Sequence, residues 1–409
     1  MRLLYTLSIL SYQCLVRIAA LFNSKARLMI QGQKNTFALL DAKLQKNQYT
    51  VWFHAASLGE FEQGRPLMED LKQRMPEAQI VLTFFSPSGY EVRKKYDLAD
   101  VVCYLPFDTP HQVHSFLDRV QPQKAVFIKY EFWANYLYAL HRRNVPIYLV
   151  SAIFRPNQLF FKKYGFFYRN LLSLYEHLFV QDKTSSDLLA AIGVQHVTVA
   201  GDTRFDRVAT IAGQAKQLPV VEAFATGNHV LVAGSSWPAD ESLLVSFFNI
   251  HPELKLILAP HVTSESHVEA ICASLKRPFI RYSQATIENV AAADCLVIDS
   301  IGLLSSIYRY GEMAYIGGGF GVGIHNVLEA AVYHIPVIFG PNYHKFREAR
   351  DLIAEGGGFS IASGDELNAL LLRFLQDDQF LAQAGEASGL YVQKNKGASD
   401  IIMQYLLKK

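Results

Sequence analysis

Two acidic residues that follow short apolar runs are the first candidates for chemistry in this 409-residue sequence. Glu60 ends the segment HAASLGE, which continues the apolar run starting at Thr50, and Glu131 follows the run that ends at Lys129. A carboxylate at such a turn can act as a general base when burial lifts its pKa toward neutral pH. An acidic residue near a helix start also stabilises that helix, so Glu60 has a purely structural interpretation as well.

A glycine-rich stretch late in the chain is the second candidate. Five of the seven residues from Gly317 to Gly323 are glycine, between a predicted strand over 313–316 and a predicted helix over 326–333. Such a turn lets a backbone approach a ligand closely and leaves amide N–H groups for an anion beside a helix N-terminus. We therefore predict a phosphate site at Gly317 to Gly319.

Asn326 and Glu329 follow that turn. Glu329 lies one helical turn after Asn326, where its carboxylate can accept two hydrogen bonds from a vicinal diol such as a ribose. Turn and acid together indicate a nucleotide site. Glycine-rich turns also serve close packing in many α/β proteins, and this spacing is not the GxGxxG fingerprint of Rossmann oxidoreductases, so both interpretations stay open.

The elements that must position these residues alternate between strand and helix. Apolar runs such as AQIVLTFFS, KAVFIKYEF and PIYLVSAIF predict buried strands, and LGEFEQGRPLMEDLKQR predicts an amphipathic helix. This alternation is typical of a mostly parallel sheet covered by helices on both faces. Ligands of such sheets bind beyond the carboxyl ends of the strands, where Glu60, Glu131 and Arg155 are expected.

The alternation lapses after Asp206 and restarts with HVLVAGSSWPADESLLVSFF. A chain of this length is natural for two domains. We predict an N-terminal Rossmann-like domain over 36–215, a second one over 225–385 and a C-terminal helix over 386–409.

Residues 1–35 differ in character from the rest. The run from Leu3 to Phe22 is mostly apolar but is interrupted by Arg17 and several polar residues, and Lys25 and Arg27 follow it. A spanning helix needs about 20 apolar residues in sequence, so this run barely qualifies. We predict a membrane anchor, amphipathic or marginally spanning, that keeps the remainder on the cytoplasmic face; a buried first helix is the alternative.

Composition excludes several classes of protein. The formal net charge is only +2, which does not favour nucleic acid as a partner. The four cysteines form no CxxC pair, and the thirteen histidines show no HExxH spacing. We therefore expect a reducing compartment and no metal site.

Two doubly wound domains facing across a cleft, one with a candidate base and the other with a nucleotide turn, are the architecture of GT-B glycosyltransferases. The chain resembles the lipid A Kdo (3-deoxy-D-manno-octulosonic acid) transferase family over nearly its whole length. The resemblance rests on a hydrophobic N-terminus, HAASLGEFEQGRPLMEDL over 54–71, Glu131-Phe132-Trp133, Ser151 with Arg155, Gln181-Asp182, Arg204-Phe205-Asp206, Gly317 to Gly319, His325-Asn326, Leu328-Glu329 and Pro336 to Pro341.

Several positions depart from the family pattern. The arginine usual between the proline and histidine of one strand end is missing at Pro260-His261, and alanine follows Glu329 where proline is common. Arg204 replaces the usual lysine, which keeps the charge but changes the donor geometry. These departures affect the contacts expected to the phosphate and carboxylate of the donor.

The resemblance implies an inverting transfer of Kdo from CMP-Kdo to a lipid A precursor at the inner-membrane surface, without a metal or cofactor. Glu60 would be the general base, with Glu131 the second choice or a positioning partner. The implied donor contacts are Glu329 to the ribose, the Gly317 turn and Asn326 to the phosphate, and Arg204 to the carboxylate. The further expected substrate-binding residues are Ser57, Gly59, Arg155, Ser235, Pro260, His261, Gly318, Gly319 and His325.

Two alternative functions remain open from the sequence. A GT-B enzyme that uses a UDP-sugar, either a transferase or a 2-epimerase, would have a similar nucleotide turn. An inactive nucleotide-binding module tethered to a membrane is the other, although acids at two strand ends argue against it. The aromatic and basic run FFKKYGFFYR over 160–169 fits a membrane-facing or acceptor-facing surface and an ordinary amphipathic helix equally well.

Overall fold

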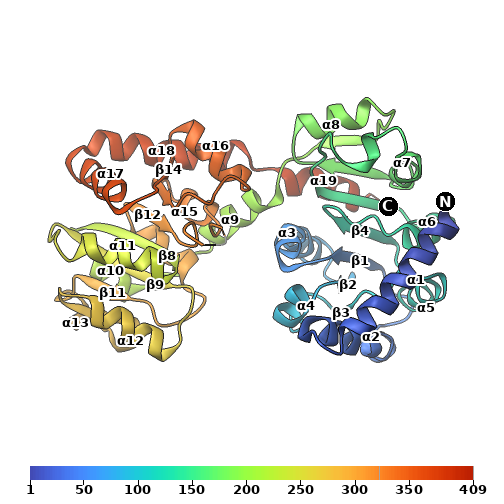
Figure 1. The fold of residues 1–409 in the computed structure, drawn as a ribbon, viewed down its shortest axis with the longest axis horizontal. Helices are drawn as coiled ribbons and strands as arrows, with labels where there is room; N and C mark the ends of the chain where they lie inside the picture. The colour runs from blue at the N-terminus through green and yellow to red at the C-terminus, as the bar shows by residue number, and fades with distance from the viewer. Residues whose placement is uncertain (322, 409) are drawn as a thin grey trace. The chain divides into compact units, whose positions relative to one another are not determined.

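The computed structural model describes residues 1–321 and 323–408 and divides into two compact units. Unit 1 contains Met1–Arg207 and Lys396–Lys409, and unit 2 contains Val208–Asn395. Each unit is built on a seven-stranded sheet whose strand pairs are all parallel, with helices on both faces (Figure 1). The predicted α/β class and the doubly wound sheets are confirmed.

The sheet of unit 1 has the order β3-β2-β1-β4-β5-β6-β7. Consecutive strands run outward from β1 in one direction and from β4 in the other, so the strand order reverses between these two. The strands are β1 Thr50–Ala55, β2 Gln79–Phe84, β3 Val101–Tyr104, β4 Lys124–Ile128, β5 Ile147–Ala152, β6 His177–Val180 and β7 Val197–Val199.

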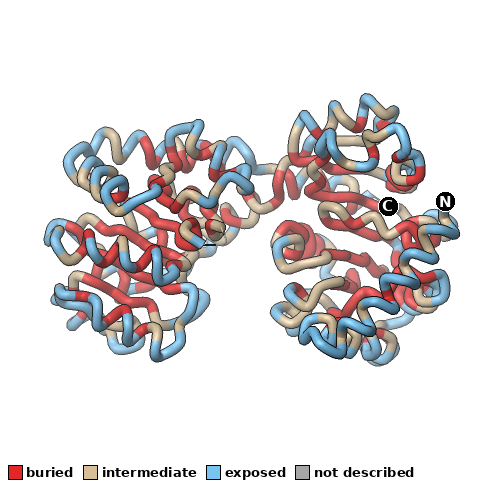
Figure 2. The backbone as a smooth tube through the Cα atoms, in the orientation of Figure 1, coloured by how far each residue is buried: buried red, intermediate tan, exposed pale blue. Residues whose placement is uncertain are grey.

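Helices on the two faces of this sheet bury alternate residues of its strands. Trp52 of β1 packs in the core beneath α5 and α6, whereas Val51 and Phe53 pack beneath α3 and α19, as the alternation of side chains along a strand requires. Figure 2 shows the buried strands between helices with exposed outer sides. The helices are α1 Arg2–Ala19, α2 Ser24–Lys43, α3 Leu58–Arg74, α4 Pro87–Arg93, α5 Pro110–Val120, α6 Ala134–Arg142, α7 Phe166–Leu172, α8 Lys183–Ala190 and α19 Ala398–Leu406, with a 3₁₀ turn over Leu159–Phe161.

The sheet of unit 2 has the order β10-β11-β9-β8-β12-β13-β14, which reverses between β8 and β12. The helix α9 (Thr203–Gly213) contains the boundary between the units. The strands are β8 His229–Ser236, β9 Leu254–Pro260, β10 Phe279–Arg281, β11 Cys295–Val297, β12 Met313–Ile316, β13 Val337–Phe339 and β14 Gly358–Ser360. The helices are α10 Pro219–Ala225, α11 Pro238–Phe248, α12 Glu265–Ser274, α13 Ile287–Val290, α14 Leu304–Ile307, α15 Leu328–Ala331, α16 Arg347–Glu355, α17 Gly364–Gln376 and α18 Asp378–Lys394.

The end of the chain differs from the single helix predicted over 386–409. Helix α18 stops at Lys394, and α19 begins only after Gly397, whose φ of 109° lies in the left-handed region that glycine tolerates. The Asp206 carboxylate accepts hydrogen bonds from the amides of Gly397 and Ser399 and so holds the start of α19. The last helix therefore packs into unit 1, where it covers α3 and the sheet.

The N-terminal helices α1 and α2 pack on unit 1 by one side only. Tyr5 donates a hydrogen bond to the buried Asp108, and Thr36 of α2 donates one to the carbonyl of Tyr104. The opposite side of α1 exposes a row of apolar side chains: Leu3, Leu4, Leu7, Leu10, Leu15 and Ile18. No single described helix is long and apolar enough to cross a membrane, but α1 and α2, bent by 117° at their junction, pass that test of length and composition together.

Candidate active site

The reversal of strand order in unit 1 places the two candidate carboxylates at neighbouring strand ends. β1 and β4 are adjacent and parallel, so their carboxyl ends meet at the same edge of the sheet. Glu60 lies in the first turn of α3, just after β1, and Glu131 lies in the loop just after β4. Ligands of doubly wound folds bind at this kind of position.

Glu60 is held by the turn that joins β1 to α3. Its Oε2 accepts a hydrogen bond of 2.5 Å from the amide of Ala56, one residue before Ser57, the helix N-cap. Burial and the nearby negative charge of Glu131 raise the pKa of Glu60 from 4.5 to about 7, against the opposing effects of the Ala56 amide, His54 and Lys129. A carboxyl group with this pKa exchanges protons readily at neutral pH, as a general base must.

Glu131 belongs to a buried hydrogen-bonded chain that also contains His54, the next-to-last residue of β1. The Nε2 atom of His54 lies 3.0 Å from Oε2 of Glu131, and Nδ1 lies 2.9 Å from Oγ1 of Thr83 on β2. Trp133 donates its indole N–H to the same carboxylate oxygen. His54 is fully buried, and 7% of Glu131 is exposed.

The partners of His54 determine where its proton lies. Because Oε2 of Glu131 can only accept, Nε2 of His54 carries the hydrogen, and Nδ1 of the neutral ring then accepts from the Thr83 hydroxyl. A protonated ring would also find acceptors for both N–H groups, since the carbonyl of Thr83 lies 3.2 Å from Nδ1. The ring is therefore satisfied in either protonation state.

Strained backbone marks three strand ends at the candidate sites. Lys129, Ser151 and Ser235 have φ values of 65°, 56° and 53°, in the left-handed region that residues other than glycine rarely adopt. Lys129 comes directly before Tyr130 and Glu131, and Ser235 lies beside the glycine-rich turn of unit 2. Strain of this kind persists where the surrounding structure over-determines it, which is characteristic of functional sites.

The other predicted residues of unit 1 differ in how they are engaged. Ser57 caps α3 without a side-chain hydrogen bond, and Gly59 is exposed, with no atom within 4 Å of where a Cβ would lie. Arg155 is exposed in the loop after β5. The guanidinium of Arg204 is bound by the buried Asp202, at 2.7 Å from Nη2 and 2.9 Å from Nε.

In unit 2 the reversal of strand order brings together Ser235 at the end of β8 and Gly317 just after β12. Pro260 ends the neighbouring strand β9, and the amide of His261 donates to the carbonyl of Ser236. The predicted donor-binding residues of this unit therefore share one edge of its sheet.

The glycine-rich turn packs closely against the backbone of neighbouring strand ends. A Cβ at Gly317 would lie 2.2 Å from the carbonyl oxygen of Ser235, and one at Gly319 would lie 2.5 Å from the amide nitrogen of Gly340. The amide of Gly317 donates to the carbonyl of Gly234, and that of Gly318 donates to the buried Asp240. The prediction that these amides stay open for a phosphate is therefore wrong for Gly317 and Gly318.

The predicted helix over 326–333 is also shorter than expected. Only Leu328–Ala331 forms α15, a single turn, so the dipole available to an anion is small. Asn326 and Glu329 contact each other: the Asn326 amide donates to Oε1 of Glu329 over 3.0 Å, and its oxygen accepts from the amide of Leu328. Val322, which belongs to the predicted turn, lies outside the described residues.

Three rings form a cluster beside that turn. The Trp237 indole stacks on His261 with ring centroids 4.7 Å apart, and His261 lies 4.6 Å from His325. Trp237 also donates its N–H to Nε2 of His325 over 3.3 Å. Burial and the neighbouring His261 lower the pKa of His325, so this ring is neutral at physiological pH and can accept as well as donate.

Sequence reasoning missed His54, Thr83, Asp240 and Trp237 as members of these sites. His54 and Thr83 lie inside fully buried strands, where a polar residue interrupts an apolar run. That interruption was the available signal, because a buried polar side chain needs a partner. Within the described residues, no group of three or more metal-ligating side chains comes together.

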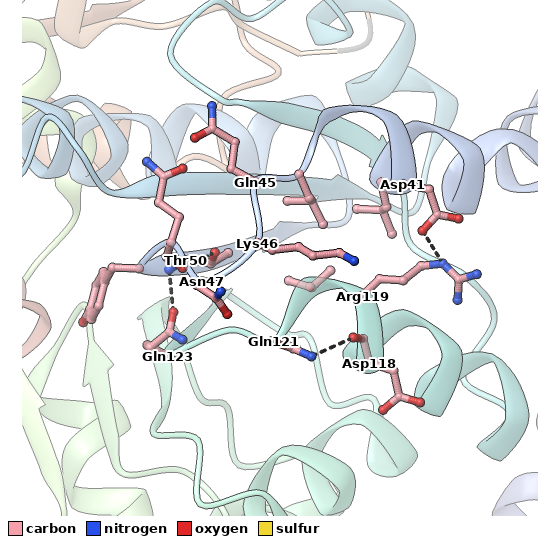
Figure 3. A pocket seen from close by; sticks show the side chains of 14 residues that line it. Asp41, Gln45, Lys46, Asn47, Thr50, Asp118, Arg119, Gln121 and Gln123 are labelled. Carbon is pink, nitrogen blue, oxygen red and sulfur yellow. Dashed lines mark hydrogen bonds and ion pairs between the residues drawn. The ribbon is translucent and has the colours of Figure 1, made fainter.

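A polar hollow of about 800 Å³ lies at the other end of the unit 1 sheet (Figure 3). It is bounded by the end of α2, the loop that leads into β1 and the end of α5. Thr50, the first residue of β1, donates its amide hydrogen to Gln123, and Arg119 pairs with Asp41 over 2.8 Å. Because it lies at the amino end of β1, this hollow is separate from the candidate active site.

Known proteins agree with this architecture. Residues 30–207 match the family model described as 3-deoxy-D-manno-octulosonic-acid transferase (kdotransferase). Among solved structures, UDP-GlcNAc 2-epimerase from Neisseria meningitidis bound to UDP-GlcNAc is similar with a TM-score of 0.57 at 15% identity, over 88% of this chain and all of that one. MurG of Acinetobacter baumannii is similar with a TM-score of 0.53 at 13% identity, over 87% of this chain and 99% of that one. These likenesses show the GT-B fold.

Two curated relatives carry the comparison across most of the sequence. The 3-deoxy-D-manno-octulosonic acid transferase of Aquifex aeolicus is 28% identical over 355 residues, which cover 84% of this chain and 92% of the relative. That of Haemophilus influenzae is 26% identical over 375 residues, 87% of this chain and 86% of the relative. The chain is therefore similar over most of its length to 3-deoxy-D-manno-octulosonic acid transferases, and its fold is that of GT-B glycosyltransferases.

Proposed function

We propose that this protein transfers Kdo from CMP-Kdo to a hydroxyl group of a lipid A precursor, with inversion at the anomeric carbon and with Glu60 as the general base. The observation that carries the proposal is the partly buried Glu60 carboxyl, whose pKa is raised to about 7, at the place where the strand order of unit 1 reverses. Similarity to 3-deoxy-D-manno-octulosonic acid transferases suggests the sugar and the reaction type.

In this reaction Glu60 removes the proton from the attacking hydroxyl of the acceptor. The amide of Ala56 donates a hydrogen bond to one oxygen of the Glu60 carboxylate and leaves the other oxygen for the substrate. Glu131 lies in the neighbouring loop, held by His54 and Trp133, and acts as a positioning residue whose charge keeps the pKa of Glu60 high.

Unit 2 binds the nucleotide of the donor in this proposal. Glu329 accepts from the ribose hydroxyls, and the side chains of Asn326, His261 and His325 contact the phosphate in place of the occupied Gly317 and Gly318 amides. CMP leaves as a nucleoside monophosphate, whose charge these polar groups stabilise as it develops. We therefore propose that neither a metal nor a cofactor is required.

The acceptor side of the proposal involves a membrane. The exposed apolar row on α1, followed by Lys25 and Arg27, supports attachment to the cytoplasmic face of a bacterial inner membrane, where an acylated acceptor would reside. Arg155 and Lys162, which are not buried, are suited to the phosphates of such an acceptor.

The test is transfer of Kdo from CMP-Kdo, generated in situ, to a tetraacylated lipid A precursor in the presence of EDTA, with product masses read directly. Glu60→Gln should lower kcat by about 10²–10⁴-fold, the usual contribution of a general base, while CMP still raises the melting temperature. Glu62→Gln, two residues along the same helix, is the matched control. Full activity in Glu60→Gln would show that another group is the base.

A GT-B enzyme that uses a UDP-sugar is the second candidate, because solved UDP-GlcNAc 2-epimerases share the fold. Thermal shifts with CMP, UMP and UDP separate the two. Stabilisation by UDP alone would favour the second candidate.

A further inference from the structure

An apolar groove of about 560 Å³ opens on unit 1 beside the candidate carboxylates. Its walls come from α1, from the loop that follows β4 and from the segment that contains the 3₁₀ turn and α7. The lining residues used below are Tyr5, Ile9, Phe132, Leu159, Phe160 and Tyr168, and we call this feature the α1 groove.

The floor of the α1 groove is a rigid aromatic cluster. The ring of Phe160 lies 4.7 Å from that of Phe132 and 6.0 Å from that of Tyr168. Tyr5 directs its hydroxyl into the protein, where it donates to Asp108 over 2.7 Å, so its polar end is satisfied. Preformed walls of this kind lower the entropy lost when a flexible ligand binds.

One charged residue, Glu131, lines the groove, at the side where it meets the candidate active site. The carboxylate of Glu131 is already bound by His54 and Trp133, and Trp133 lines the groove as well. The groove thus reaches the positioning residue Glu131 and continues as a mostly apolar surface. Cavities of this size with few polar groups are typical of small-molecule sites.

The side chains around the groove also connect it to the exposed apolar face of α1. Tyr5 and Ile9, spaced four residues apart, face the groove, whereas Leu3, Leu7 and Leu10 occupy the outer face of the same helix. Leu159 lies at the groove and is 43% exposed. An apolar ligand anchored in a bilayer would meet a continuous apolar path from α1 to Glu131.

We propose that the α1 groove binds one acyl chain of the lipid acceptor and so aligns the acceptor's sugar hydroxyl with Glu60. This inference rests on the proposed function and deepens it, because it names the part of the acceptor that the protein recognises. The occupant is the acceptor's chain and not that of a bulk phospholipid, because the groove reaches Glu131, whose charge acts on the proposed base Glu60, and only a molecule with a reacting sugar needs to come this close to the base.

Fluorescence of Trp133 provides a direct test of binding. In a Trp237→Phe background, which retains Trp133 and the core residue Trp52, an N-acylglucosamine with a brominated C14 chain should quench the Trp133 part of the emission when its chain lies in the groove, and the unbrominated compound should not. A brominated phospholipid of the same chain length distinguishes the two sources of acyl chain. Quenching by the phospholipid at equal or lower concentration would overturn the choice of occupant.

Two adjacent substitutions on α1 provide matched variants. Ile9→Asn places an amide in the groove, and Leu10→Asn places the same amide on the exposed face, so both reduce the hydrophobicity of α1 similarly. An unpaired buried amide opposes binding, so Ile9→Asn should raise the half-quenching concentration about tenfold or more. Leu10→Asn should leave it unchanged within about twofold, the error expected for an exposed substitution. Equal effects, or no quenching in the parent protein, would overturn the proposal.

Transfer assays form the second arm and keep the two proposals distinguishable. The loss caused by Ile9→Asn should be about tenfold larger in kcat/KM for a tetraacylated acceptor than for the same disaccharide phosphate without acyl chains. If the parent protein glycosylates neither acceptor, the proposed function fails, and the quenching experiment still decides whether the groove binds an acyl chain. Vesicle binding of both variants reports any effect on membrane attachment.

Discussion

The imidazole of His54 and the carboxylate of Glu131 lie 3.0 Å apart, across the two strand ends between which the sheet of unit 1 reverses its order. This pair holds Glu131 in place, and the negative charge of Glu131 raises the pKa of Glu60. Because Glu131 is buried and Glu60 is partly buried, that charge acts through a poorly screened environment. The arrangement separates one acid that is held in place from one that is free to exchange protons.

The pH dependence of catalysis should report Glu60. Since the base acts only when deprotonated, and its pKa is raised to about 7, kcat/KM should fall about tenfold for each pH unit below 7 and level off above it. A pH profile of initial rates with CMP-Kdo measures this. A limb centred near 4.5, the ordinary value for a glutamate, would contradict the burial of the reacting carboxylate.

Replacing Glu131 should shift the acidic limb of the pH profile of kcat/KM. Its charge is the second-largest cause of the raised pKa of Glu60, so Glu131→Gln should shift the limb toward lower pH, whatever its effect on kcat. The residual activity of the variant, measured across the same pH range, gives the shift. Glu62→Gln removes a charge from α3 that does not act on Glu60 and should leave the limb in place; movement in both variants would indicate a general electrostatic effect.

Glu60→Gln should stabilise the folded protein at pH 8, although it lowers the activity. The carboxyl group of Glu60 binds its proton more tightly in the folded protein than in the unfolded chain. Its contribution to the free energy of unfolding is therefore fully present below about pH 4.5 and is lost as the pH rises through about 7. Glu60→Gln removes the buried charge, so it should raise the free energy of unfolding at pH 8 by on the order of 2 kcal/mol. Melting curves at pH 5 and pH 8 test this, and an equal gain at both values would exclude the ionisation as its cause.

Gly59 offers a steric test of the entrance to Glu60. Alanine fits this position without contacts and favours the helix by up to about 1 kcal/mol relative to glycine. We expect Gly59→Ala to leave the melting temperature equal or higher and to raise KM for the acceptor, because its methyl group lies in the space beside Glu60. Unchanged kinetics would remove Gly59 from the substrate-binding residues.

Gly319 tests whether packing explains the glycine-rich turn. A methyl group there would meet the Gly340 backbone, which has no flexible end that can yield, so Gly319→Ala should destabilise unit 2 by about 1–3 kcal/mol. Gly213→Ala is the control, since its Cβ would meet nothing within 4 Å. Denaturant unfolding monitored by Trp237 fluorescence measures both variants. Equal stability of the two would contradict close packing as the reason for glycine at position 319.

The sequence allowed the strand ends to be predicted, but not the chemistry inside the strands. Glu60 and Glu131 were found because polar residues directly after apolar runs lie at the carboxyl edge of a parallel sheet. His54 was given no role, because its interruption of the apolar run in β1 shows only that a partner is needed, and its partners Thr83 and Glu131 are distant in sequence. The order of the strands in the sheet, which no local sequence pattern reveals, brings these three side chains together.

For the glycine-rich turn, the sequence led to a prediction that the structure contradicts. Its composition predicted open amides, but whether an amide is open depends on what packs against it. Asp240, far away in the sequence, accepts the hydrogen bond of the Gly318 amide, and the Gly340 backbone explains why position 319 has no side chain. Composition can therefore indicate a close approach of backbones without revealing which molecule makes it.

The packing of the last helix, α19, into unit 1 affects when each unit can complete its fold during synthesis. Unit 2 is encoded entirely between two parts of unit 1, so every residue of unit 2 is synthesised before α19 of unit 1. Until α19 docks, the sheet surface that Ile402, Met403 and Leu406 cover stays exposed, and Lys124 lacks the carbonyls of Tyr405 and Leu406. Unit 1 therefore completes its fold only after all of unit 2 has been synthesised.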